Sequence, residues 1–152
     1  MDLRRIIFRG KCVSDSKYAG EWVTGGYVAP DADCKKRNEG LIVEYFGGNT
    51  TITYHVDPET VGQFTGLVDK NGVKIFEGDI LECVSWNEFW SVDGKPLEQL
   101  RRRLLVGHRN GSFVCIERQQ APFDNKVWDI ISNHDCIIIG NIYDNPELLA
   151  TK

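Results

Sequence analysis

Short runs of β-forming residues, separated by turns that contain glycine and asparagine, dominate this sequence. The clearest example is Arg109-Asn110-Gly111, which lies between two β-rich runs. Asn-Gly in that setting is the strongest short signal for a β-hairpin. Residues 41–46 and 51–56 likewise lie on either side of a Gly-Gly-Asn-Thr turn. This pattern predicts a chain folded mainly from short antiparallel strands.

The run at residues 51–56 also predicts which side chains are buried. Apolar Ile52, Tyr54 and Val56 alternate with polar residues, as in a strand with one face on a core. We therefore expect a mainly β fold, either all-β or β-rich α+β. The expected architecture is a compact barrel-like or sandwich arrangement of short antiparallel strands with one to three short helices.

Three prolines predict helical segments, and one of them, Pro146, starts a short C-terminal helical turn. Asp57 and Pro58 supply a cap and a first helical residue, and nearby glycines limit that helix to one turn. Pro96 opens a second possible helix, because the leucines that follow it recur at helical spacing. These leucines are Leu97, Leu100 and Leu104.

The length of 152 residues fits one domain of ordinary size. The apolar content of 41% and the charged content of 26% are globular values, which excludes disorder as the global state. We find no internal repeat, low-complexity stretch or long linker. We therefore expect a single domain over residues 1–152, with a possible inserted aromatic arm at residues 85–100.

The cysteines and the apolar segments indicate the compartment. Five cysteines are widely spaced and form no CxxC pair, so we expect reduced thiols, several of them small apolar fillers in strands. No apolar run approaches the roughly 20 residues of a membrane span, and the N-terminus lacks the apolar core of a signal peptide. We therefore expect a cytoplasmic protein with no membrane partner.

The charges are unevenly distributed along the chain. The net charge of −4 argues against a typical duplex-binding protein, which carries a basic excess. However, two segments are basic, whereas residues 57–82 are acidic. If the basic segments were adjacent, they could follow a phosphate backbone. Nucleic-acid binding, single-stranded or duplex, therefore remains an alternative, with these candidate residues: Arg4, Arg5, Arg9, Lys11, Arg101, Arg102, Arg103 and Arg109.

An aromatic cluster is the best indication of a partner. Trp86, Phe89 and Trp90 fall within five residues of an irregular segment. Leaving them in water costs about 25 cal/mol per Å² of apolar area. They either cover the domain's own core or contact another chain. We expect a homo-oligomer, because a small β domain also has strand edges to cover.

The patterns that would indicate catalysis or metal binding are weak. His134-Asp135-Cys136 offers three ligands in a row, but adjacent residues of a strand point to opposite faces, and the paired spacings of a zinc site are missing. The Gly-Gly pairs are not followed by the Lys-Ser/Thr of a phosphate-binding loop. We therefore expect no metal, no cofactor and no catalytic residue, and a hydrolase with an unrecognised site is the third alternative.

Three regions of the chain form a recognisable pattern: residues 8–11 and 22–25; residues 56–67, 69–72 and 75–80; and residues 139–149. Together they resemble the YopX family of small phage and prophage proteins. The resemblance implies a mostly β fold, a phage or prophage origin, a bacterial host cell and a tendency to self-associate. It implies no activity, so no catalytic residue is carried over.

The central matching segment has two interpretations. Its glycines and acids can form a wholly structural scaffold of turns and strands. Alternatively, its loops can carry a binding surface, because loops on rigid scaffolds often carry function. The candidate binding residues are Gln63, Thr65, Asp69, Lys70 and Asp79, together with the aromatic arm. We therefore expect a phage accessory protein that acts as a non-enzymatic binding or assembly module.

Overall fold

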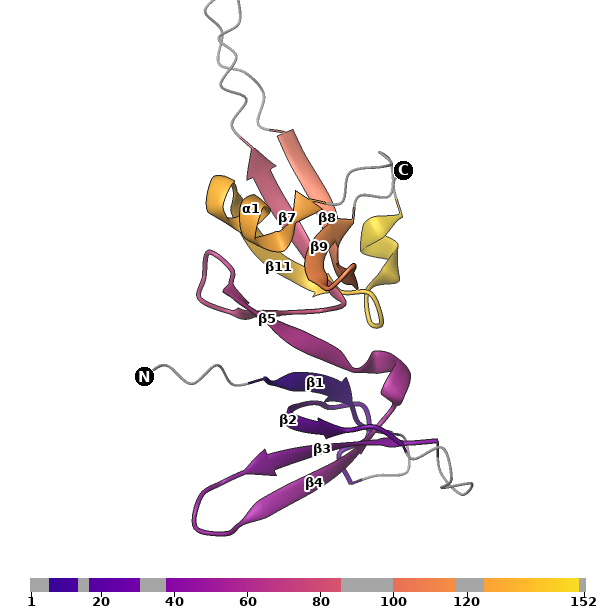
Figure 1. The fold of residues 1–152 in the computed structure, drawn as a ribbon. Helices are drawn as coiled ribbons and strands as arrows, with labels where there is room; N and C mark the ends of the chain where they lie inside the picture. The colour runs from indigo at the N-terminus through magenta and orange to yellow at the C-terminus, as the bar shows by residue number, and fades with distance from the viewer. Residues whose placement is uncertain (1–5, 14–16, 31–37, 86–99, 117–124, 151–152) are drawn as a thin grey trace, which may run out of the picture. The chain divides into compact units, whose positions relative to one another are not determined.

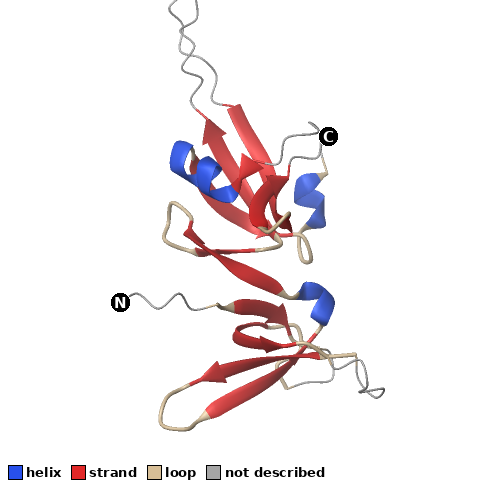
Figure 2. Cartoon of the chain, viewed as in Figure 1, coloured by secondary structure: helices blue, strands red, loops and turns tan. Residues whose placement is uncertain are grey.

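The computed structural model describes residues 6–13, 17–30, 38–85, 100–116 and 125–150 of the chain. Strands make up most of this part (Figure 2). They form antiparallel sheets, so the predicted mainly β class is confirmed, although the sheets do not close into a barrel. The chain divides into two compact units, Met1–Phe64 (unit 1) and Thr65–Lys152 (unit 2), which are described separately.

Unit 1 is an antiparallel sheet in the order β4-β3-β2-β1-β5 (Figure 1). Its strands are β1 (Phe8–Lys11), β2 (Trp22–Val28), β3 (Gly40–Tyr45), β4 (Thr51–Val56) and the first residues of β5 (Gly62–Val68). One face of the sheet carries the core, which includes Cys12, Ile42, Tyr54 and Val56. The alternation predicted for residues 51–56 is confirmed, because Tyr54 and Val56 are buried while their neighbours in β4 are more exposed.

A short 3-10 helix, η1 (Pro58–Thr60), joins β4 to β5. The Asp57 side chain caps it by accepting a hydrogen bond from the backbone N–H of Glu59 at 3.0 Å. Pro58 occupies the start of the helix, where its missing N–H costs nothing. The predicted helical turn is therefore confirmed.

Unit 2 contains a five-stranded antiparallel sheet in the order β10-β9-β8-β7-β11, together with the end of β5 and its neighbour β6. The strands are β6 (Lys74–Phe76), β7 (Asp79–Ser85), β8 (Leu100–Arg109), β9 (Ser112–Ile116), β10 (Asn125–Lys126) and β11 (Asp135–Asn141), and the helices are α1 (Val127–Asn133) and η2 (Pro146–Leu149). The core of unit 2 comprises Ile75, Leu81, Cys83, Leu104, Val106, Cys115, Val127 and Cys136.

The two helices of unit 2 cover opposite faces of its sheet. Val127 of α1 joins Leu104 in the core on one face. Arg103, the neighbour of Leu104, points to the other face and donates from Nη1 to the Leu148 carbonyl of η2 at 3.2 Å. Figure 1 shows α1 and η2 on either side of these strands. A helix therefore contacts each face of β8.

The β8–β9 hairpin follows the sequence prediction. Asn110 and Gly111 have φ values of 51° and 76°, as a two-residue type I′ turn requires. Asparagine tolerates this left-handed conformation better than most residues, and glycine adopts it without steric cost.

The helix predicted after Pro96 is wrong for the residues that the structure describes. Leu100 and Leu104 lie in β8, opposite Ser85 and Leu81 of β7. β8 pairs with β7 on one side and with β9 on the other. This double ladder satisfies the backbone of β8 and overrides the helical spacing of its leucines. Leu97 lies outside the described residues.

The prediction of reduced thiols is wrong for two cysteines. Cys83 and Cys136 stand directly opposite each other on β7 and β11, with Cα atoms 4.1 Å apart, and form a disulfide. Directly opposed residues in antiparallel strands lie close enough to be bridged. Cys12 and Cys115 are free and buried, as the prediction of apolar fillers states, and Cys34 lies outside the described residues.

Candidate functional site

Asp69 fastens a turn to a neighbouring strand. Its carboxylate is buried, at 6% exposure, and accepts hydrogen bonds from the backbone N–H groups of Asn71 at 2.8 Å, Val73 at 2.9 Å and Ile138 at 3.1 Å. Burial favours the neutral acid, but these three hydrogen bonds outweigh it, so the pKa of Asp69 is lowered from its ordinary value of 3.8. Asp69 thus ties the β5–β6 turn to β11.

Other residues of the central segment also make internal contacts. Thr65 Oγ1 donates to the Ile75 carbonyl at 2.9 Å, which links β5 to β6. Asp79, at 1% exposure, accepts a hydrogen bond from the backbone N–H of Phe76 at 2.8 Å. Asp79 thereby closes the β6–β7 turn and offers little surface to a ligand.

The two remaining candidates of this segment are more exposed. Lys70 Nζ contacts Asp135 Oδ2 at 2.6 Å, and both side chains are more than half exposed. Gln63 is half-buried in β5, opposite Phe8 of β1, and belongs to unit 1. The structure places Asp69 and Lys70 on one turn, whereas Thr65 and Asp79 lie elsewhere in unit 2.

Several predicted site residues lie outside the described residues. They are Arg4, Arg5, Trp86, Phe89 and Trp90. The aromatic arm expected at residues 85–100 is described only at its two ends, which pair with each other as the last residue of β7 and the first of β8.

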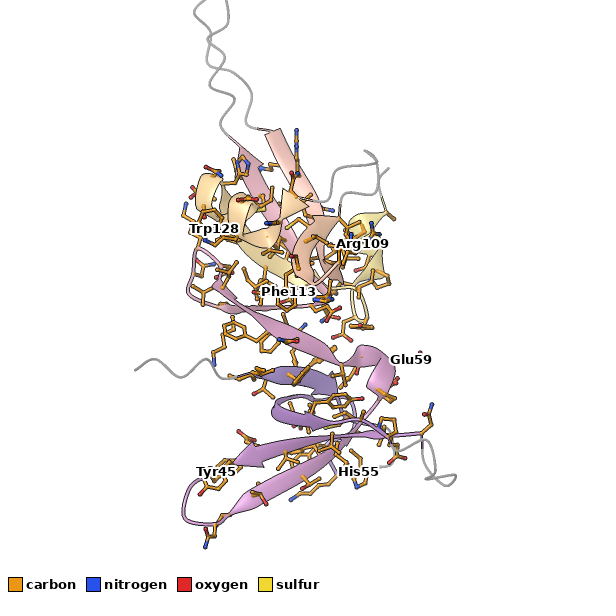
Figure 3. All side chains as sticks on the ribbon, viewed as in Figure 1. Tyr45, His55, Glu59, Arg109, Phe113 and Trp128 are labelled. Carbon is orange, nitrogen blue, oxygen red and sulfur yellow. A yellow bond between two sulfur atoms is a disulfide. The ribbon has the colours of Figure 1, made fainter. Side chains whose placement is uncertain are left out.

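The arginines of β8 do not form one patch on a single face. Arg101 and Arg103 share a face and both contact the Glu82 carboxylate, at 3.1 Å and 3.5 Å. Arg102 stands opposite Cys83 and so points to the other face. Arg109 ends the strand beside the hairpin (Figure 3), about 26 Å from Arg101 at about 3.3 Å per residue.

The basic residues of unit 1 share one face of its sheet. Lys11 stands opposite Trp22, and Arg9 stands opposite Thr24. Arg9 lies over the Trp22 ring, with 4.8 Å between the guanidinium carbon and the ring centroid, which is a cation–π distance. This face is opposite to the core face, because Phe8, Val23 and Tyr27, at the alternating positions, pack against the core.

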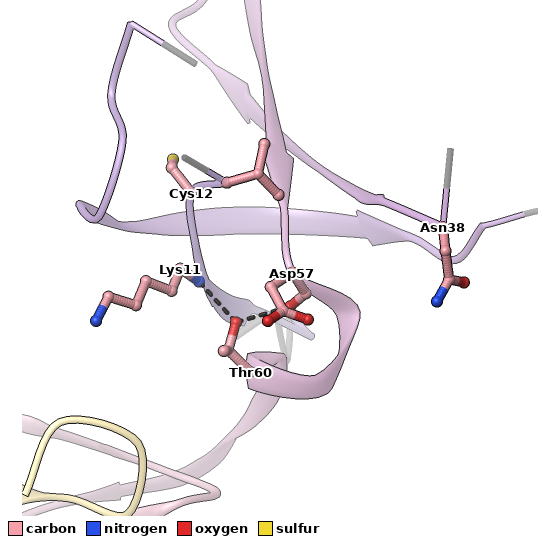
Figure 4. Close-up of a pocket in the computed structure, with 6 residues that line it drawn as sticks. Lys11, Cys12, Asn38, Asp57 and Thr60 are labelled. Carbon is pink, nitrogen blue, oxygen red and sulfur yellow. Dashed lines mark hydrogen bonds between the residues drawn. The ribbon is translucent and has the colours of Figure 1, made fainter. Parts of the chain in front are cut away.

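A pocket of about 330 Å³ lies beside η1 in unit 1 (Figure 4). It is lined by Lys11, Cys12, Val13, Asn38, Asp57 and Thr60. The Thr60 hydroxyl in this pocket already makes two hydrogen bonds. Its Oγ1 accepts from the Lys11 N–H at 2.9 Å and donates to the Asp57 carbonyl at 2.7 Å. Burial and the nearby Glu21 raise the pKa of Cys12, so its thiol is a poor nucleophile at neutral pH.

The described residues contain no group of three or more His, Cys, Asp or Glu side chains placed to hold a metal ion. Of the three consecutive candidate ligands in the sequence, Cys136 is engaged in the disulfide. Burial raises the pKa of Cys115 to about 12, so this thiol stays protonated at neutral pH. The described thiols therefore offer no activated nucleophile.

The outer edge of β4 is a feature that the sequence patterns do not predict. β4 is the last strand of its sheet, and no described strand pairs with its outer side between Thr51 and Tyr54. Beside it, the β3–β4 hairpin exposes two aromatic residues, Tyr45 at 66% and Phe46 at 57% (Figure 3). Tyr45-Phe46 before a Gly-Gly turn was a visible signal, but the sequence does not show that β4 lies at the edge.

The fold and its sheets define a small, mainly β protein. The family model described as YopX protein matches residues 14–150. The chain therefore belongs to the YopX family, as the sequence resemblance indicated.

A solved structure supports the same fold. The chain is similar to protein EF1440 from Enterococcus faecalis, with 23% sequence identity and a TM-score of 0.50. The similarity covers 95% of this chain and 98% of that one. A comparison with curated proteins gives no match. Among the described residues, no helix is long and apolar enough to cross a membrane.

Proposed function

We propose that this protein is a non-enzymatic binding or assembly module that associates with further copies of itself through the outer edge of β4. The observation that carries the proposal is this edge, which is unpaired from Thr51 to Tyr54 within the described part of the chain. Unpaired strand edges are templates for pairing with another chain.

The hydrogen-bond pattern shows which backbone groups are available on this edge. The His55 carbonyl accepts from the Val13 N–H at 3.1 Å, on the side of β4 that faces away from β3. Because backbone groups alternate in direction along a strand, the N–H and C=O of Thr51 and Thr53 point to the same outer side. An antiparallel copy of β4 could pair with these groups about a two-fold axis.

The surrounding surface supports this edge as a contact. Phe46 is 57% exposed at the end of the same hairpin, and contact with a second chain would remove its ring from water. The side chains of β4 that point away from the core are two threonines and His55. The strand contains no lysine or proline, the residues that commonly block pairing at a sheet edge. Membership of the YopX family supports a setting for this module, as a phage or prophage accessory protein in a bacterial host cell.

The experiment compares two substitutions at one position by sedimentation velocity at tens of micromolar. Thr53→Pro removes an outward N–H, and edge strands tolerate proline at such a position. Thr53→Ala is the matched control, because it retains that N–H. We expect wild type and Thr53→Ala to sediment as oligomers and Thr53→Pro to sediment as a monomer. A strictly monomeric wild type, or a Thr53→Pro variant that stays oligomeric, would contradict the proposal.

A further inference from the structure

The outer face of the unit 1 sheet combines aromatic and cationic side chains. The strand registers place opposed residues on a common face, so Lys11 with Trp22, Val43 with Thr53, and Leu41 with His55 all point away from the core. The buried residues Ile42, Tyr54 and Val56 occupy the alternating positions. The outer face is therefore a continuous surface over β1–β4.

The aromatic residues of this face offer flat surfaces. Trp22 is half-buried in β2, and Arg9 lies over its ring at 4.8 Å. Tyr45 is at the end of β3 on the same face and is 66% exposed. Tryptophan, tyrosine and arginine are the side chains on which unpaired nucleic-acid bases stack.

The charge of this face is opposite to that of the chain. Its charged residues on β1–β4 are Arg9 and Lys11, whereas the whole chain has a net charge of −4. Glu44, the acid within these strands, turns to the core face and accepts a hydrogen bond from the Tyr54 hydroxyl at 3.1 Å. Glu39, just before β3, lies 3.0 Å from His55 Nδ1. Glu39 is therefore a carboxylate beside this face, where it is paired with His55, and the acid within β1–β4 lies on the core face.

We propose that the outer face of the unit 1 sheet binds a short single-stranded nucleic acid, whose bases stack on Tyr45 and on the Arg9–Trp22 pair and whose phosphates contact Arg9 and Lys11. A single strand fits this surface better than a duplex, because its bases are free to stack on side chains. The proposal goes beyond self-association and uses different residues from the Thr53 edge.

The test measures fluorescence anisotropy of a labelled short oligothymidylate against the full-length protein at low salt. Tyr45→Ala removes an exposed ring with little risk to the fold, and we expect roughly tenfold weaker binding. The double variant Arg9→Gln/Lys11→Gln removes two cations. It should also weaken binding roughly tenfold, and it should reduce the slope of log affinity against log salt by about 1.4.

A matched control separates this face from general basic attraction. Arg101→Gln/Arg103→Gln removes the same charge from β8 in unit 2, where both arginines contact Glu82, and it should leave affinity unchanged within twofold. A duplex of the same length and poly-glutamate should compete poorly. Circular dichroism verifies that each variant is folded, and Trp22→Leu provides a second aromatic test.

Several outcomes would overturn the assignment. If wild type did not detectably bind the oligonucleotide at low salt, the proposed binding site would be wrong. If Arg101→Gln/Arg103→Gln lost as much affinity as Arg9→Gln/Lys11→Gln, the binding would be general charge attraction. The same would follow if poly-glutamate competed as well as the unlabelled oligonucleotide. Unchanged affinity in both Tyr45→Ala and Trp22→Leu would place any binding elsewhere. The oligomeric state is measured in parallel, so failure here is distinguishable from failure of the Thr53 edge.

Discussion

The two units of this protein use their charged side chains differently. In unit 2, Asp69 and Asp79 are buried and bind backbone N–H groups, and Arg101 and Arg103 share the Glu82 carboxylate. In unit 1, Arg9 and Lys11 lie beside Trp22 on the outer sheet face. These charges of unit 2 hold turns and strands together, as Asp57 does at η1 in unit 1. Arg9 and Lys11 instead form part of a surface.

This difference indicates which side chains are available to a partner. A carboxylate that is satisfied by several backbone donors stabilises a fold and has little capacity left for a ligand. An aromatic and cationic sheet face makes a smaller contribution to its own core and can receive a partner. Changes in unit 2 should mainly alter stability, and changes in unit 1 should mainly alter binding or assembly.

The largest expected effect is on the Cys83–Cys136 disulfide of unit 2. It closes a loop with a sequence separation of 53 residues, so its loss should lower the free energy of unfolding by about 4 kcal/mol through loop entropy. The measurement is a urea titration of wild type and Cys83→Ala/Cys136→Ala, each with and without dithiothreitol. Reductant should destabilise wild type alone. A reduced wild type with unchanged stability would contradict the assigned role.

The next effect concerns Asp69. Asp69→Asn weakens three hydrogen bonds to backbone N–H groups, which should cost about 2 kcal/mol at neutral pH. Because the pKa of Asp69 is lowered in the folded state, its contribution is fully present above the unfolded pKa of about 3.9 and is lost as the pH falls through the folded pKa.

Chemical denaturation as a function of pH checks the Asp69 prediction. The difference in stability between wild type and Asp69→Asn should be constant near neutral pH and should narrow below about pH 3.9. Oligonucleotide binding at neutral pH should stay unchanged, because Asp69 lies in unit 2. If Asp69→Asn kept the stability of wild type but bound the oligonucleotide more weakly, Asp69 would be a binding residue and its structural role would be wrong.

Much of the fold could be predicted from local sequence signals. The Asn110-Gly111 hairpin, the capped turn at Asp57 and the alternation in β4 follow from preferences that act over a few residues. The helix expected at Leu100 and Leu104 failed because its competitor was long-range pairing with β7 and β9. The disulfide was missed for the same reason, since its cysteines meet only through the β7–β11 register.

The candidate site was harder to predict than the fold. The sequence indicated that Asp69 and Asp79 could be structural or functional, and only their hydrogen bonds distinguish the two. Arg9 and Lys11 were candidates for nucleic acid, but their shared face with Trp22 depends on the β1–β2 register. The open edge of β4 depends on strand order, which no local pattern specifies.

The smallest expected effect is at Lys70, the exposed candidate of the central segment. Its Nζ contacts Asp135 Oδ2 at 2.6 Å, and the two side chains are 58% and 53% exposed. Solvent and salt screen such a pair, so Lys70→Gln should change the free energy of unfolding by less than about 1 kcal/mol. A double-mutant cycle with Asp135→Asn isolates the pair, and its coupling should decrease with added salt. Lys70→Gln should oligomerise and bind the oligonucleotide as wild type does, because both proposed surfaces lie in unit 1. Loss of either property would show that a charged residue of unit 2 also contacts a partner.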